Sequence, residues 1–148
     1  MENYFTIGVF GIIFDKQNRV LLCHRRDYDL WNLPGGGLKS EEFILDGVKR
    51  EVEEETGLEV EIFKLIGVYD KPQEKDIALS FTCKVVGGKI TLNDEADKIE
   101  YFDINNLPHN TSPKQVERIK DAFQNLKNVI IKKQIGKCSI NLVKDGEL

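Results

Sequence analysis

The alternation of apolar and polar residues divides the chain into short extended segments and two amphipathic helices. Runs rich in β-branched and aromatic residues, bounded by polar or glycine-containing turns, predict strands. These runs cover residues 4–14, 20–23, 58–69, 77–86 and 99–102. The first two are separated by a short polar stretch, so we expect them to form a hairpin.

The first helix is predicted over residues 41–56. Ser40 is a candidate N-cap, and Gly57 follows the last helical position, where a left-handed residue commonly ends a helix. One face of this segment is apolar and is expected to pack on a sheet. It consists of Leu45, Val48 and Val52.

A second helix is predicted over residues 114–126, where apolar residues recur at helical spacing. The tail, residues 129–143, alternates weakly and is expected to form a hairpin that turns at Gly136. Each amphipathic helix must bury one apolar stripe, so the order of elements indicates an α/β fold with a mixed β-sheet between helices.

The length and charge of the chain restrict the kinds of protein it can be. Its 148 residues fit one domain, residues 1–148, and 41% hydrophobic content is ordinary for a globular core. The 21 basic and 25 acidic residues give a net charge of −4, which gives no reason to expect nucleic acid or a membrane surface as a partner. An anionic substrate would therefore need a metal ion.

The three cysteines do not form a metal-binding or disulfide pattern. Cys23, Cys83 and Cys138 are far apart and include no CxxC spacing, which favours a reducing compartment, the cytoplasm. No apolar run approaches the roughly 20 residues of a membrane-spanning helix.

The most informative motif lies between the predicted strands. Gly36 is followed after five residues by Glu42, and after seven more by the run REVEEETGL at residues 50–58. This spacing resembles the Nudix box. The resemblance implies an α/β/α sandwich and a hydrolase that cleaves a nucleoside diphosphate linked to another moiety, such as a nucleoside triphosphate, an oxidised dNTP or ADP-ribose.

Three carboxylates of this motif share one helical face. Glu51, Glu54 and Glu55 stand at i, i+3 and i+4, within reach of a single ion. Their mutual repulsion calls for a cation, and oxygen ligands favour Mg²⁺ or Mn²⁺. A backbone carbonyl of the glycine run, represented by Gly36, is a reasonable further ligand.

The resemblance also assigns supporting roles. Arg50 would hold a glutamate in its ligating orientation, because a guanidinium orients carboxylates well. Glu42 and Gly57 are expected to be structural, the former near the start of the helix and the latter at its end.

Substrate recognition lies outside the motif. Arg25 and Arg26 follow a strand and are candidates to bind phosphates, and Glu95 is a candidate extra carboxylate. Stacking on a base or sugar could come from one of three aromatic residues, Phe5, Tyr69 or Phe81.

A second class of function stays open. A Nudix-fold module could bind a nucleotide without cleaving it, but such modules typically lose motif carboxylates, and all three are present here. The expected partner is a small nucleotide-type molecule, and the protein could be a monomer or a homodimer.

Overall fold

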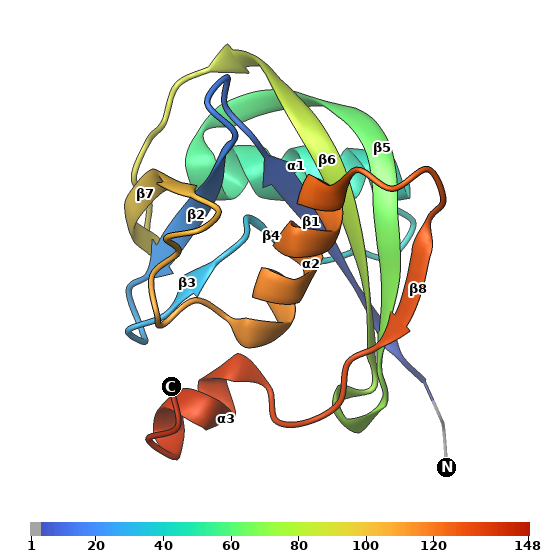
Figure 1. Cartoon of the computed structure of the whole chain (residues 1–148). Helices are drawn as coiled ribbons and strands as arrows, with labels where there is room; N and C mark the ends of the chain where they lie inside the picture. The colour runs from blue at the N-terminus through green and yellow to red at the C-terminus, as the bar shows by residue number, and fades with distance from the viewer. Residues whose placement is uncertain (1–3) are drawn as a thin grey trace.

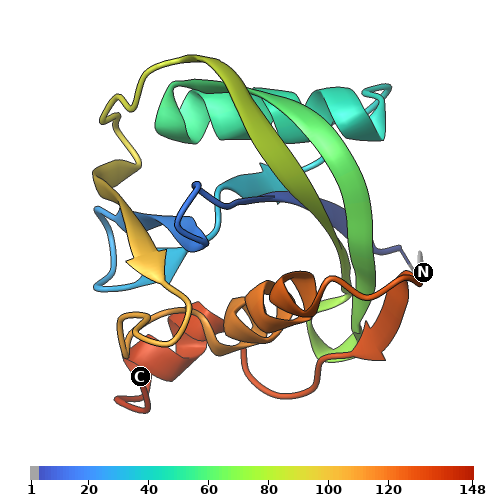
Figure 2. The same ribbon diagram turned by 45° about the horizontal axis from the view of Figure 1, so that its top comes forward.

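The computed structural model describes residues 4–148 and contains two β-sheets with helices on opposite sides (Figures 1 and 2). No helix in these residues is long and apolar enough to cross a membrane. The elements are, in order, β1 (Thr6–Ile13), β2 (Arg19–Arg25), β3 (Trp31–Asn32), β4 (Gly35–Gly37), α1 (Ile44–Thr56), β5 (Leu58–Lys71), η1 (Pro72–Glu74), β6 (Asp76–Gly88), β7 (Ala96–Asp103), α2 (Pro113–Gln124), β8 (Ile130–Lys133) and α3 (Ser139–Lys144).

The larger sheet is mixed, as predicted. Its strand order is β4-β1-β6-β5-β8. Strands β5 and β6 form a long antiparallel pair, while β1 lies parallel to β6 and β8 parallel to β5. A smaller antiparallel sheet has the order β3-β2-β7. The predicted strands at residues 58–69, 77–86 and 99–102 all lie within observed strands.

The first strands are buried on both faces, and this explains their continuous apolar sequence. In β1, Val9 and Ile13 enter the core cluster beneath α1, whereas Ile12 enters the cluster beneath α2. Strand β2 alternates in the same way, with Leu21 on the α1 side and Leu22 on the α2 side. The two clusters therefore form the two layers of an α/β/α sandwich, with α1 and α2 on opposite sides in Figure 2.

The prediction of a hairpin between β1 and β2 is wrong. The only β-pairing between these two segments is an isolated bridge between Phe14, just after β1, and Val20. Strand β1 is already flanked by β4 and β6, so neither of its edges is free for β2. The polar turn at residues 15–18 instead passes the chain from one sheet to the other.

Helix α1 begins later than predicted. It starts at Ile44, with Phe43 at the N-cap, so the proposed Ser40 cap is wrong. The preceding residues are held in a loop because Glu41 has a left-handed backbone (φ 63°) and the Glu42 carboxylate accepts the backbone N–H of Lys39.

The rest of the helix prediction is partly correct. Val48 and Val52 are buried as expected, but Leu45, in the first turn, is half exposed. Gly57 ends α1 with φ 79°, so the predicted end of the helix is confirmed. A Cβ there would lie 2.4 Å from the carbonyl oxygen of Lys89, so a side chain has no room.

The C-terminal segment is not a hairpin. Residues 130–133 pair with the edge of β5, and the chain then turns at Gly136 (φ 103°) into α3 rather than into a returning strand. The Lys114 ammonium donates to the Gly136 carbonyl, and Ser112 shares a hydrogen bond with Ser139. These contacts hold α3 close to the start of α2, below that helix in Figure 1.

Two of the aromatic residues proposed to stack on substrate are core residues. Tyr69 is completely buried, and its hydroxyl donates to Asp121 at 2.9 Å. Phe81 is buried in the cluster beneath α1. Neither ring is available to a base or a sugar. Phe5 is half exposed and does not line the cavity described below.

Tyr69→Phe should lower the free energy of unfolding by about 0.5 to 1.5 kcal/mol, because one buried hydrogen bond to Asp121 is lost. Urea denaturation measures this change. The KM for substrate should stay at the wild-type value, and a large rise in KM would contradict the structural role.

Candidate active site

The acidic motif residues lie where α1 passes the glycine strand β4. The backbone N–H of Gly35 donates to the Glu55 carboxylate at 2.8 Å. A Cβ at Gly36 would lie 2.8 Å from both carboxylate oxygens of Glu51, so glycine is needed for this close approach. Glu54, on the same side of the helix, is more than half exposed.

Arg50 connects these carboxylates to the loop before the helix. Its Nε and Nη2 atoms donate to the two oxygens of Glu42 at 2.6 and 2.9 Å. Its Nη1 atom donates to Glu51 at 2.9 Å and to Glu54 at 3.2 Å. The geometry is the one expected for a residue that orients glutamates, because a guanidinium presents several donors in one plane.

The hydrogen bonds of Glu42 explain its place in the motif. The side-chain hydrogen bonds from Arg50, with the backbone N–H of Lys39, lower the pKa of Glu42 to about 2. The hydrogen bonds to Glu42 and Glu51 raise the pKa of Arg50. Glu42 therefore stays ionised and holds Arg50 against the loop, which is the structural role the sequence indicates.

The pKa values of the inner carboxylates, Glu51 and Glu55, shift in the opposite direction. Burial raises the pKa of Glu55 to about 8, and the charges of Glu51 and Glu95 add to the effect against the Gly35 hydrogen bond. Burial also raises the pKa of Glu51, although Arg50 opposes the shift. Negative charge is thus unfavourable here unless a cation offsets it.

The donor set fits a hard divalent cation. It consists of carboxylates and a neighbouring glycine backbone, the oxygen ligands that magnesium and manganese prefer. As they stand, no three or more His, Cys, Asp or Glu side chains within residues 4–148 are arranged to hold a metal ion. Each carboxylate can accept several contacts, so the bonds from Arg50 and Gly35 leave oxygen lone pairs free.

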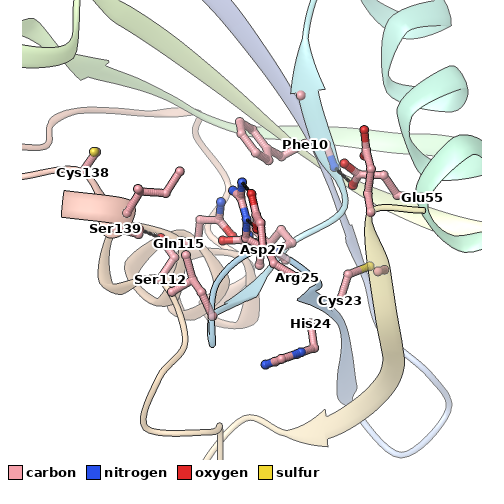
Figure 3. Close-up of a pocket in the computed structure, with 18 of the residues that line it drawn as sticks. Phe10, Cys23, His24, Arg25, Asp27, Glu55, Ser112, Gln115, Cys138 and Ser139 are labelled. Atoms are coloured by element: carbon pink, nitrogen blue, oxygen red, sulfur yellow. Dashed lines mark hydrogen bonds and ion pairs between the residues drawn. The ribbon is translucent and has the colours of Figure 1, made fainter. Parts of the chain in front are cut away.

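A cavity of about 500 Å³ opens beside Glu55. Figure 3 shows Glu55 on one side of it and Ser139 and Cys138, from the C-terminal segment, on the opposite side. The predicted site residues Arg25, Arg26 and Glu95 also line the cavity. Its other polar and aromatic lining residues include Phe10, His24, Asp27, Asn32, Lys71, Glu74, Asp94, Ser112, Lys114, Gln115 and Arg118.

The two predicted arginines line the cavity but are already engaged. Arg25 makes a two-point contact with Asp27, both distances being 2.7 Å. The Nε atom of Arg26 donates to the carbonyl of Asn93, and its backbone N–H donates to the carbonyl of Glu95. A phosphate would have to compete with these partners.

Asn93 is a positioning residue that the sequence interpretation missed. Its side-chain oxygen accepts the backbone N–H groups of Glu95 and Ala96, both at 2.9 Å, and its amide donates to the carbonyl of Glu55 at 2.7 Å. These bonds fix the acidic loop to the end of α1 and so place Glu95 in the cavity wall. The sequence signal was an Asn that precedes two acidic residues in a turn.

His24 joins two further carboxylates at the cavity. Its Nδ1 atom lies 2.7 Å from Asp97, and its Nε2 atom lies 2.9 Å from Asp29. Burial favours the neutral ring, but the hydrogen bonds that the protonated ring donates to both carboxylates outweigh this and raise the pKa of His24. The His24 side chain is therefore built into the structure rather than facing solvent.

Comparison with known proteins agrees with this arrangement. The family model for the NUDIX domain matches residues 4–124. An ADP-ribose pyrophosphatase of Methanocaldococcus jannaschii is 38% identical over 110 residues, which is 70% of this chain and 64% of that protein. A MutT-like protein of Streptomyces ambofaciens is 33% identical over 118 residues, covering 80% of this chain and 77% of that protein.

The fold has solved counterparts. A NUDIX hydrolase from Nitrosomonas europaea superimposes with a TM-score of 0.79 at 21% identity, over 92% of this chain and 82% of that one. The family model and the sequence relatives show that the chain belongs to the Nudix family of hydrolases, enzymes that act on phosphoanhydride bonds. The present chain spans 64% of the length of the archaeal relative.

His24→Gln should reduce stability most at low pH. Because the native pKa of His24 is raised, its ion pairs contribute fully below the unfolded pKa of about 6.5, and the contribution is lost as the pH rises through the native pKa. Urea unfolding at pH about 5.5, 7 and 8.5 measures the difference from wild type. His109→Gln, at an exposed position, is the control. A difference that grows with pH would contradict the assignment.

Proposed function

We propose that the protein is a metal-dependent pyrophosphohydrolase that cleaves the diphosphate linkage of a nucleoside diphosphate joined to another moiety. The candidate substrates are nucleoside triphosphates, oxidised dNTPs and compounds of the ADP-ribose type. The observation that carries the proposal is the position of Glu51 and Glu55 beside β4, with Glu54 on the same face of α1 and Glu55 in the wall of a cavity of nucleotide size. The name of the archaeal relative supports ADP-ribose as the first substrate to test.

The cofactor of this reaction is Mg²⁺ or Mn²⁺. Glu51, Glu54 and Glu55, with a backbone carbonyl at Gly36, are the residues that would hold it. The exposed Glu54 side chain has the freedom to turn toward its two neighbours. When bound, such an ion polarises phosphate oxygens and lowers the pKa of a coordinated water.

The chain's own residues supply positioning and proton acceptance. Arg50 orients Glu51 and Glu54 and is itself held by Glu42. Glu95 is our candidate to accept a proton from the attacking water, since it lines the cavity near enough to Glu55 to influence its pKa. Arg25 and Arg26 are candidates to contact the phosphates after releasing Asp27 and Asn93.

One experiment separates the substrates. The protein is incubated with Mg²⁺ and a panel containing ADP-ribose, nucleoside triphosphates and oxidised dNTPs, and the products are resolved by chromatography. Release of a nucleoside monophosphate together with the phosphate-bearing remainder of the substrate supports diphosphate cleavage. No turnover of any panel member with either metal would overturn the proposal.

Glu55→Gln and Glu54→Gln should each lower kcat by about 100-fold or more, because ligand charge is lost while side-chain shape is kept. Chelator should abolish wild-type turnover. Glu53→Gln removes the same charge from an exposed position of the same helix and should keep wild-type kcat. Near wild-type rates in both variants would favour the alternative, a module that binds a nucleotide without cleaving it.

Arg50→Lys should lower activity about 10- to 100-fold and raise the Mg²⁺ concentration needed for half-maximal rate, because an ammonium cannot make the two-point contact with Glu42 while reaching Glu51. Arg19→Lys, at an exposed Arg19–Asp15 ion pair, is the matched control. If Arg50→Lys changes only the melting temperature and leaves the metal requirement unchanged, Arg50 is not a positioning residue.

A further inference from the structure

The side of the cavity formed by α2 differs in charge from the side formed by Glu55. Three basic residues line it, Lys71 at the end of β5 and Lys114 and Arg118 on α2, with a single acidic one, Glu74. Figure 3 shows Gln115 and Ser112, which belong to this region, across the cavity from Glu55. The cavity therefore has an acidic side near the motif and a basic side near α2.

Arg118 is a buried cation that lacks a carboxylate partner. It is 1% exposed, and its Nε and Nη2 atoms donate to the side-chain oxygen of Gln134 at 3.1 and 2.9 Å. Its Nη1 atom has no hydrogen-bond partner. Within residues 4–148, Arg118 forms no ion pair with a carboxylate. The guanidinium carbon lies 5.1 Å from the Phe10 ring and 5.3 Å from the Tyr69 ring.

Such an arrangement is unfavourable without a ligand. A buried charge needs a counter-charge or a full set of hydrogen bonds, and amide oxygen and aromatic faces compensate Arg118 only in part. Burial accordingly lowers the pKa of Arg118 to about 10. An anionic group of a ligand would supply the missing charge.

The start of α2 adds further donors to the same region. Ser112 makes no side-chain cap, Pro113 has no N–H, and in residues 4–148 the backbone N–H groups of Lys114 and Gln115 have no acceptor outside the helix. The side-chain oxygen of Gln115 is taken by the backbone N–H of Leu33, so its amide nitrogen is left as a donor. A helix start with free N–H groups favours anions.

The nearby carboxylates do not cancel this preference. Glu74 lies 2.6 Å from Lys114 and 3.7 Å from Lys71, and Asp76 lies 2.7 Å from Lys71. Lys71 and Lys114 thus have carboxylate partners, whereas Arg118 has none in direct contact. The carboxylates of Asp76, Glu74 and Glu117 act on Arg118 only from beyond ion-pair distance, so the unpaired positive charge of this side of the cavity is located at Arg118.

We propose that this basic side of the cavity binds an anionic group of the substrate that is separate from the diphosphate to be cleaved. The inference rests on the proposed function, since it takes the cavity to be the substrate site. Among the candidate substrates it favours nucleoside diphosphate derivatives with an additional negative group, a phosphomonoester or a carboxylate, over the parent compounds such as ADP-ribose itself. Compounds without such a group bind more weakly.

The test compares matched ligand pairs in excess chelator, so that no turnover is needed. ADP-ribose 2′-phosphate is compared with ADP-ribose, and UDP-glucuronate with UDP-glucose, by titration calorimetry. The two pairs place the extra negative charge on the nucleoside and on the distal sugar, respectively. In at least one of the two pairs, the member with the additional negative group should bind about 10- to 100-fold more tightly than its parent compound, as expected for a charge-assisted contact.

Equal affinities within both pairs, or no binding of either anionic member, would overturn the proposal. Because these measurements exclude catalysis, they are independent of whether the enzyme cleaves diphosphates. A protein that prefers the anionic ligand but does not turn over any substrate would keep this inference and lose the proposed function.

Two lysines of α2 provide a matched pair of variants. Lys114→Gln should reduce the preference for the ligand with the additional anionic group about 10-fold while keeping the affinity for the member of the pair that lacks this group. Lys120→Gln makes the same change at an exposed position of the same helix and should keep the full preference. Arg118→Gln removes a buried, hydrogen-bonded side chain and is expected to lower stability, so Lys114→Gln carries the test. An unchanged preference in Lys114→Gln would overturn the assignment of this side of the cavity.

Discussion

The structure around the motif depends on one guanidinium that is shared among three carboxylates. Arg50 contacts Glu42 in the loop before α1 and Glu51 and Glu54 on α1, and it also donates to the carbonyl of Gly37 in β4. A single side chain therefore joins loop, helix and strand at the place where acidic groups accumulate. Without its charge, the helix would carry neighbouring glutamates with no internal counter-charge, and the loop would lose its main attachment.

The types of element could be predicted from the sequence because they depend on local periodicity. Strands buried on both faces gave continuous apolar runs, and both long helices showed apolar residues at helical spacing. The errors arose where a distant contact decides the local structure. The start of α1 is delayed by the bonds of Glu42, and residues 130–133 pair with β5 instead of with a neighbouring segment.

The residues of the candidate site could likewise be predicted only in part. The motif residues could be found because they are close in sequence and share one helical face. Phe10, Gln115 and Arg118 could not, because only the fold brings them to one cavity. Tyr69 was wrongly proposed to contact substrate, because a sequence does not reveal whether an aromatic ring in a strand points into the core or into a site.

The position of α3 has a consequence for how related enzymes diverge. The family match ends at residue 124, yet Cys138, Ser139 and Ile140 line the cavity beside residues of the matched domain. Part of the cavity wall is thus supplied from outside the segment that carries the acidic motif. Substitutions in this short C-terminal stretch can reshape the chamber while the motif glutamates and Arg50 stay untouched, so selectivity and hydrolytic chemistry are free to evolve separately.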